Sequence, residues 1–286
     1  MNTYGFDKGG FSMHKIINAS YSAHFDDYDL LLAAAAAAPG TGLELSIYSP
    51  WHKPEFMANQ QAQKARFAGL PLTFHGPFED ICAASEPGSL GRKQFVDSWK
   101  YAFDVYEEFG AESIVLHTHK VRDIQPADME TLRGYVTDTI QEVAKIAIGR
   151  GVCLTVENVG HWVKNNELFN EEQYIALFDQ LPKEIGSLID VGHALINRWD
   201  ITHVIHTLGE RIFSYHLHNN NGCGDTHRPL FEAGNRYTEA EMKQLLLTTN
   251  RCSPNADWIL EYRFGGQITA EFLAHDMAVL TELNGK

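Results

Sequence analysis

The segment IFSYHLHNNNGCGDTHR, residues 212–228, joins an apolar run to a dense group of polar side chains. Its first residues are typical of a buried β-strand, and the small, turn-forming residues after them indicate a loop. His216 and His218 lie two residues apart, so both side chains point to the same side of an extended chain, and Asp225 and His227 repeat this spacing. Imidazole and carboxylate are common ligands of zinc, iron and manganese. The segment therefore predicts a strand that delivers metal ligands at its carboxyl end.

Short β-rich segments alternate with longer helical ones along the rest of the chain. Such alternation requires parallel strands joined by crossovers, and eight units in 286 residues predict a closed (β/α)8 TIM barrel. The sequence lacks the glycine-rich dinucleotide fingerprint, P-loop and GxSxG motif of open α/β sheets. The predicted strands are residues 15–21, 42–48, 71–78, 113–119, 152–159, 187–193, 212–219 and 258–263. The predicted helices are residues 28–38, 54–67, 90–109, 129–150, 171–180, 202–208, 239–248 and 269–283, with Gly110 and Gly151 ending the third and fourth.

Composition limits the possible partners and the cellular setting. We expect one barrel domain over residues 14–286 after a polar leader of residues 1–13. The formal charge of −14 disfavours a nucleic-acid surface, which needs clustered Lys and Arg. The four cysteines have no CxxC spacing, which favours a reduced, cytoplasmic setting. The longest apolar run, residues 30–38, is too short to cross a membrane, so we expect a soluble protein.

Potential metal ligands follow six consecutive predicted strands. Active sites of TIM barrels lie at the carboxyl ends of the strands, so these side chains should meet. A buried carboxylate without a partner costs several kcal/mol, so those behind apolar strands need a cation, a hydrogen-bond network or a core arginine. Arg263, two residues after Glu261, is one candidate for such an arginine. Besides those in residues 212–228, the strand-end side chains are His75, His117, His119, Glu157, Asp190, His193 and Glu261.

These motifs resemble those of the xylose isomerase-like TIM-barrel superfamily, which includes sugar isomerases and epimerases and the AP endonuclease IV family. The likeness to the isomerase branch implies one divalent ion bound by Glu157, Asp190, His216 and Glu261. The two glutamates would then move a proton on either face of a sugar carbon. Residues 41–45, TGLEL, also resemble the GxEL pattern of that branch.

The resemblance to endonuclease IV is more specific, because its larger ligand cluster is matched at every position. It implies up to three ions of zinc, manganese or iron and hydrolysis at phosphorus. The motifs supply His75 (HGP), Asp190 and His193 (DxxH), His216 (HLxN), and Asp225 and His227 (DxH). The other implied ligands are His117, Glu157 and Glu261.

Our leading hypothesis is a metal-dependent hydrolase with an endonuclease IV-like multinuclear site that acts on a small phosphorylated or sugar-like substrate rather than DNA. The alternative is a mononuclear sugar or sugar-phosphate isomerase or epimerase, and a third reading is a barrel that only binds a metal or sugar. Arg228 and Arg263 are candidates for binding a substrate anion, and His119 and His218 for binding other substrate groups. The sequence leaves open the substrate, the metal and the oligomeric state.

Overall fold

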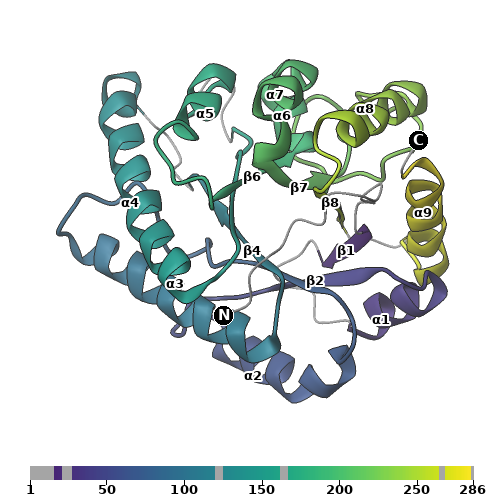
Figure 1. Cartoon of the computed structure of the whole chain (residues 1–286), viewed down its shortest axis with the longest axis horizontal. Helices are drawn as coiled ribbons and strands as arrows, with labels where there is room; N and C mark the ends of the chain where they lie inside the picture. The colour runs from purple at the N-terminus through teal and green to yellow at the C-terminus, as the bar shows by residue number, and fades with distance from the viewer. Residues whose placement is uncertain (1–15, 21–27, 120–124, 162–166, 264–267, 285–286) are drawn as a thin grey trace.

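The computed structural model describes residues 16–20, 28–119, 125–161, 167–263 and 268–284. The predicted leader, residues 1–13, lies outside these ranges, so the predicted domain boundary stays a prediction. Within the described ranges, eight parallel strands close into a barrel in chain order, with β1 paired to β8 (Figure 1). The predicted (β/α)8 barrel is therefore confirmed. The strands are β1 (Ile16–Ser20), β2 (Gly42–Ser46), β3 (Leu72–His75), β4 (Ser113–His117), β5 (Leu154–Glu157), β6 (Gly186–Asp190), β7 (Ile212–Leu217) and β8 (Asp257–Tyr262).

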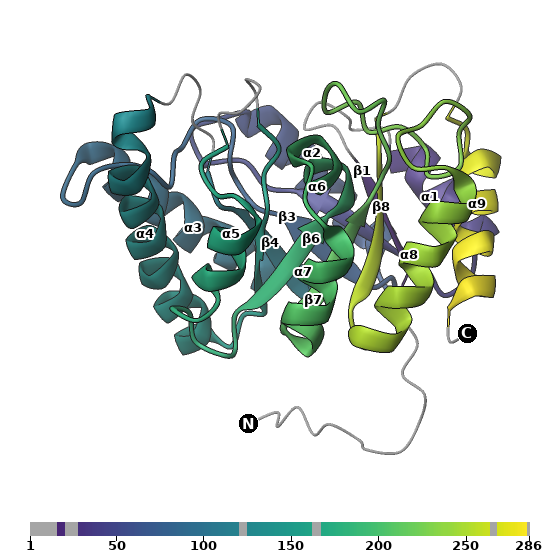
Figure 2. The same cartoon turned by 90° about the horizontal axis from the view of Figure 1, so that it is seen from above.

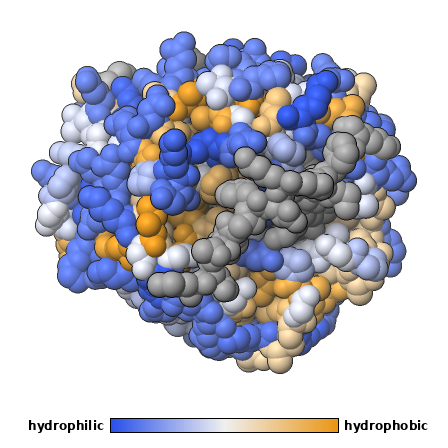
Figure 3. Space-filling model, in the orientation of Figure 1, coloured by the Kyte–Doolittle hydropathy of each residue, from blue (hydrophilic) through white to orange (hydrophobic). Residues whose placement is uncertain are grey.

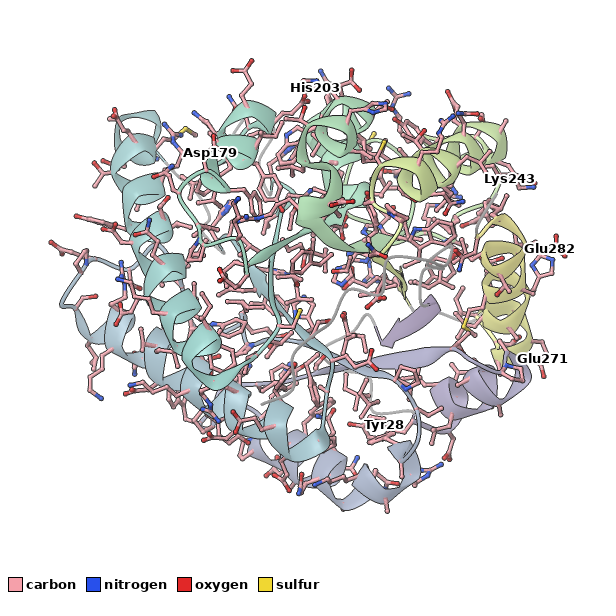
Figure 4. The ribbon with its side chains drawn as sticks, in the orientation of Figure 1. Tyr28, Asp179, His203, Lys243, Glu271 and Glu282 are labelled. Carbon is pink, nitrogen blue, oxygen red and sulfur yellow. The ribbon has the colours of Figure 1, made fainter. Side chains whose placement is uncertain are left out.

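Helices surround the strands as an outer layer, which Figure 2 shows from a second direction. On α8 and α9, the labelled Lys243, Glu271 and Glu282 lie on the outer rim in Figure 4. The helices are α1 (Tyr28–Ala37), α2 (Pro54–Gln63), α3 (Leu90–Phe109), α4 (Met129–Arg150), α5 (Glu171–Leu177), α6 (Val191–Asn197), α7 (Ile201–Leu208), α8 (Glu239–Cys252) and α9 (Ala270–Leu283), with 3-10 turns η1 (Lys64–Phe67), η2 (Pro126–Asp128) and η3 (Gly209–Arg211).

Side chains alternate between the two faces of each strand, and the buried apolar residues accordingly form two separate clusters. Most strand residues pack with the helices in one large core, whereas Val115, Leu188 and Ile259 form a small cluster of their own. Successive side chains of a strand point to opposite faces, so residues two positions further on share the face of this small cluster. Those residues are His117, Asp190 and Glu261. The barrel interior is thus apolar in the middle and carries candidate ligands at its carboxyl end.

One predicted element differs from the structure in a way that affects the site. The strand predicted over residues 187–193 ends at Asp190, and α6 begins at the next residue. The cause is local, because Asp190 Oδ1 accepts the backbone N–H of His193 at 2.6 Å, which is an N-cap interaction. His193 therefore lies in the first turn of a helix and not in a strand.

The other differences are shifts of element ends. Gly110 and Gly151 end α3 and α4 with φ of 67° and 70°, the left-handed conformation that glycine adopts without steric cost. The predicted helix over residues 54–67 is α2 followed by η1, and α8 extends to Cys252. The four cysteines are free, and no helix among the described residues combines the length and apolar character needed to cross a membrane. Figure 3 shows a largely hydrophilic outer rim on one face, interrupted by apolar patches.

Candidate metal centre

All nine predicted ligands lie together at the carboxyl end of the barrel. Their donor atoms, together with that of His218, fall into four groups. Within each group all donor atoms lie within 4.8 Å of one another. We call the first three the His75 group (His75, His117, Glu157), the central group (Glu157, Asp190, His216) and the His227 group (His193, His218, Asp225, His227). A fourth set joins Asp190, His218 and Glu261. Glu157 joins the His75 and central groups, and the fourth set joins the central group to the His227 group through Asp190 and His218.

The His75 group is assembled by three neighbouring strands. His117 and Glu157 are register partners on β4 and β5, and His75 ends β3 beside them. The His75 and His117 Nε2 atoms lie 2.8 Å apart, and His117 Nε2 lies 3.2 Å from Glu157 Oε2. His75 Nδ1 donates to the Gly76 carbonyl at 3.1 Å, which leaves its Nε2 for the group. A Cβ at Gly76 would lie 2.2 Å from the Trp99 ring, so the turn after His75 requires glycine.

Three buried atoms at the central group have no hydrogen-bond partner among the described residues: Glu157 Oε2 and His216 Nδ1 of the group itself, and Glu261 Oε2 beside them. His216 Nδ1 lies 3.1 Å from the Glu261 oxygen, 3.6 Å from the Glu157 oxygen and 3.9 Å from Asp190 Oδ2. Orphaned buried donors and acceptors are costly, and a cation would satisfy the carboxylates and the ring nitrogen together. This convergence fits a divalent metal.

Within the described part of the chain, no arginine neutralises the buried carboxylates of Glu157 and Glu261. The ion-pair partners of Glu157 and Glu261 there are all histidines. Arg263, the candidate partner of Glu261, is exposed. The alternative of a core arginine that neutralises these carboxylates is therefore not observed.

Electrostatics in the groups favour charged carboxylates. Burial alone would raise the pKa of Glu157, but His117 and His216 lower it well below its usual value. Burial likewise opposes the low pKa of Glu261, which His216 and His227 produce. Deprotonated carboxylates are the form that binds a metal.

The His227 group is formed by the loop after β7 and by α6. Asn219 and Arg228 pair as an antiparallel bridge, with both backbone hydrogen bonds at 2.8 Å, so the loop returns Asp225 and His227 to the barrel mouth. Asp225 Oδ2 lies 3.2 Å from His193 Nε2 and 3.0 Å from His227 Nε2. His227 holds a left-handed backbone with φ of 43°, a strained conformation that is common at functional sites.

His218 is the added member of this group, although the sequence suggested substrate binding. Its Nε2 donates to Asp190 Oδ2 at 3.0 Å, and its ring stacks on His227 with centroids 3.8 Å apart. His218 thus connects the central and His227 groups. His119 is buried beside Thr118, and burial with the nearby His117 and His193 lowers its pKa to about 3, so it stays neutral.

In the part of the chain that the structure describes, the side chains of the two predicted anion-binding arginines form no hydrogen bond or ion pair with the ligand groups: one is bound within its own loop and the other is exposed. The Arg228 guanidinium is occupied in its own loop by Glu232 and by the carbonyls of Ala233 and Gly234. Arg263 donates its backbone N–H to the His227 carbonyl at 2.9 Å, and its side chain is exposed. The substrate-binding roles of Arg228, Arg263, His119 and His218 stay predictions.

Sequence reasoning did not select Glu44 as a site residue. Glu44 lies in β2, is 2% exposed, and contacts His216 Nε2 at 3.0 Å. A signal was present, because an acidic residue in the middle of an apolar strand needs a partner. The partner is 172 residues away in sequence, so the pattern alone could not identify it.

Comparisons with known proteins agree with this architecture. A family model described as a xylose isomerase-like TIM barrel matches residues 32–264. An uncharacterized protein of Methanocaldococcus jannaschii is 24% identical over 172 residues, which cover 59% of this chain and 58% of that protein. The chain thus spans little more than half the length of this curated relative.

Solved structures share the fold at low identity. A D-tagatose 3-epimerase-like protein aligns with a TM-score of 0.72 and 17% identity over 94% of this chain and 96% of its own. An AP endonuclease of family 2 from Brucella melitensis gives 0.67 and 15% over 94% and 99%. An IOLI protein with a bound zinc atom gives 0.70 and 15% over 94% and 97%.

Proposed function

Because this chain belongs to the xylose isomerase-like TIM-barrel family, we propose that it is a metal-dependent enzyme that hydrolyses a phosphoester bond in a small molecule. One observation carries the proposal: Glu157 is common to the His75 group and the central group, and the His227 group adjoins them through His218. A single ion would leave the two outer groups without use. Three adjacent donor sets support a multinuclear site of zinc, manganese or iron.

The residues of the chain would divide the work. Glu157 belongs to two donor groups and would serve as a ligand in both, while histidines would complete the outer groups. When bound, the ions would supply positive charge that activates water and stabilises the developing charge of a phosphoryl group. Asp190 keeps its orientation because His193 N–H binds Oδ1 and His218 binds Oδ2. Such fixed ligands are what preorganised catalysis requires.

The substrate proposal follows from charge. The chain carries 37 acidic against 23 basic residues, the Arg228 guanidinium is bound within its own loop, and Arg263 is exposed. A polyanion such as DNA gains its affinity from clustered cations, so a small phosphorylated or sugar-like compound fits better.

A second candidate is a mononuclear sugar or sugar-phosphate epimerase. The central group together with Glu261 already supplies enough donors for one ion. Proteins of similar fold include the D-tagatose 3-epimerase-like protein and an L-ribulose 3-epimerase. In this case Glu157 and Glu261 would exchange protons with the two faces of a sugar carbon.

Metal stoichiometry and activity distinguish the candidates. We expect two or three equivalents of metal in the wild-type protein, and loss of about one equivalent in each of His75→Ala and His227→Ala. His203→Ala is the matched control, because His203 lies on the outer surface of α7 (Figure 4) and should keep all the metal. Turnover of small phosphate esters should disappear in Glu157→Gln.

Three other outcomes would contradict the proposed hydrolase. One equivalent that both histidine variants retain would contradict the multinuclear site. Solvent deuterium entering a ketose, without hydrolysis of any phosphate ester, would establish the epimerase instead. Neither activity in a metal-replete protein would indicate a barrel that only binds its ligand.

A further inference from the structure

His216 is oriented differently from three other histidines of the site. In those three rings Nδ1 donates to a backbone carbonyl, so Nε2 faces the ligand groups. In His216 the relation is reversed, because Nε2 lies 3.0 Å from Glu44 Oε1 and Nδ1 faces the central group without a hydrogen-bond partner. The other three rings and their acceptors are His75 with Gly76 at 3.1 Å, His193 with Asn158 at 2.9 Å and His227 with Glu261 at 3.0 Å.

The Glu44 carboxylate is itself held in place. Glu44 and Thr73 are register partners on β2 and β3, and Thr73 Oγ1 donates to Glu44 Oε2 at 3.0 Å. One carboxylate oxygen is thus bound by a hydroxyl and the other by the His216 ring. Since Glu44, Thr73 and His216 are almost fully buried, water does not compete for these bonds.

A carboxylate can only accept a hydrogen bond, so the hydrogen of this contact belongs to His216 Nε2. A histidine that binds a metal is neutral, so the lone pair of a metal-binding His216 would lie on Nδ1. That atom lies 3.1 Å from Glu261 Oε2 and 3.6 Å from Glu157 Oε2, the two other buried atoms here without a hydrogen-bond partner. All three atoms therefore converge on one position.

We propose that Glu44 is a positioning residue, which binds His216 Nε2–H and so presents Nδ1 to the ion of the central group. The inference rests on the proposed metal site and concerns a residue outside the nine predicted ligands. The carboxylate fixes the tautomer and the ring orientation, and it increases the basicity of the ligand nitrogen. In the His75 and His227 groups, backbone carbonyls fix the ring orientation in the same way, but they are neutral acceptors.

Zinc binding by full-length variants tests this role. With Zn²⁺ alone as the probe, chelator competition should show that Glu44→Ala weakens the central ion about 10- to 100-fold and leaves the other equivalents in place. Glu44→Gln keeps the side-chain volume and an acceptor oxygen but loses the charge, so its loss of zinc affinity should be smaller. Thr73→Val removes the hydrogen bond to Glu44 Oε2 and should reduce zinc affinity less than either Glu44 variant.

Asp276→Asn is the matched control for loss of a buried acid. Asp276 is 3% exposed and accepts from Tyr262 at 2.7 Å, and no ligand group contains it. Its substitution should leave zinc affinity unchanged. Circular dichroism of each variant separates lost folding from lost binding, and Glu44→Gln serves if Glu44→Ala does not fold.

A spectroscopic readout reports the tautomer directly. Long-range ¹H–¹⁵N spectra of the zinc-loaded, histidine-labelled protein should show His216 protonated at Nε2 and bound through Nδ1, opposite to His75, His193 and His227. This signature should change in Glu44→Ala. Zinc affinity unchanged in the Glu44 variants, or ligation of His216 through Nε2, would overturn the inference. If the wild-type protein binds no zinc, the proposed function itself fails.

Discussion

Gly192 shows how one missing side chain shapes the site. A Cβ at this position would lie 1.9 Å from Cε1 of His218, well inside van der Waals contact. Asn220 Nδ2 also donates to the Gly192 carbonyl at 2.8 Å, which ties the loop after β7 to α6. The glycine therefore provides the space in which His218 stacks on His227 and binds Asp190.

Gly192→Ala should displace the His218 ring and weaken metal binding in the His227 group. Helix propensity favours alanine here, so a loss reflects overpacking, which costs about 1–3 kcal/mol. Metal content and zinc affinity measure the effect, with at least a tenfold loss expected for one equivalent. Gly224→Ala, in the loop after β7 and with open space around its Cβ, is the control. Equal zinc affinity in both variants would contradict this role of Gly192.

At the scale of elements, helix ends place ligands that strand periodicity does not. Asp190 is both the last residue of β6 and the N-cap of α6, so one carboxylate ends a strand, begins a helix and faces the central group. The helix turns His193 back toward Asp225, with Nε2 at 3.2 Å from its carboxylate. A continuous strand would have carried His193 away from the barrel axis.

The end of α4 allows a matched test of helix termination. Gly151 has φ of 70°, whereas Gly149 lies two residues earlier within the helix, and both have open space for a Cβ. Gly151→Ala should lower stability by about 1 kcal/mol, because the left-handed conformation disfavours a side chain. Gly149→Ala should raise it by about 0.5–1 kcal/mol. Urea unfolding measures both, and changes of the same sign would contradict the assigned helix end.

For the whole molecule, the arrangement concentrates negative charge in the barrel mouth. Five carboxylates lie there in a protein of net charge −14: those of Glu44, Glu157, Asp190 and Glu261 are buried, and that of Asp225 is more exposed. Histidines surround them, and none of the described ion pairs of this cluster involves Lys or Arg. A fold built in this way should gain stability from bound cations.

Removing the metal should therefore lower the melting temperature. Ligand binding to the native state alone stabilises it by about 4 kcal/mol at 1,000 times Kd, roughly 10 °C for a protein of this size. Thermal melts with and without a strong chelator measure the shift, and added zinc should restore it. His216→Ala should respond less to the chelator. A wild-type protein that contains metal yet melts equally with and without chelator would contradict the expectation.

The barrel and the general location of the site follow from the sequence because their causes are local. Apolar periodicity, turn residues and glycine helix ends predict the elements, and the parallel barrel puts every strand's carboxyl end at one mouth. The side chains His75, His117, Glu157, Asp190 and Glu261 could thus be assigned to one site without coordinates. These patterns act over a few residues, which is why sequence reasoning could use them.

The tertiary structure decided the orientation of each ligand. His216 and His218 point the same way in an extended chain, so spacing could not distinguish them, whereas the folded chain gives His216 to the central group and stacks His218 on His227. The Glu44 contact joins residues 172 positions apart. Strand closure brings β2 and β7 together across the barrel, and hydrogen bonds between distant side chains leave no periodic trace in the sequence.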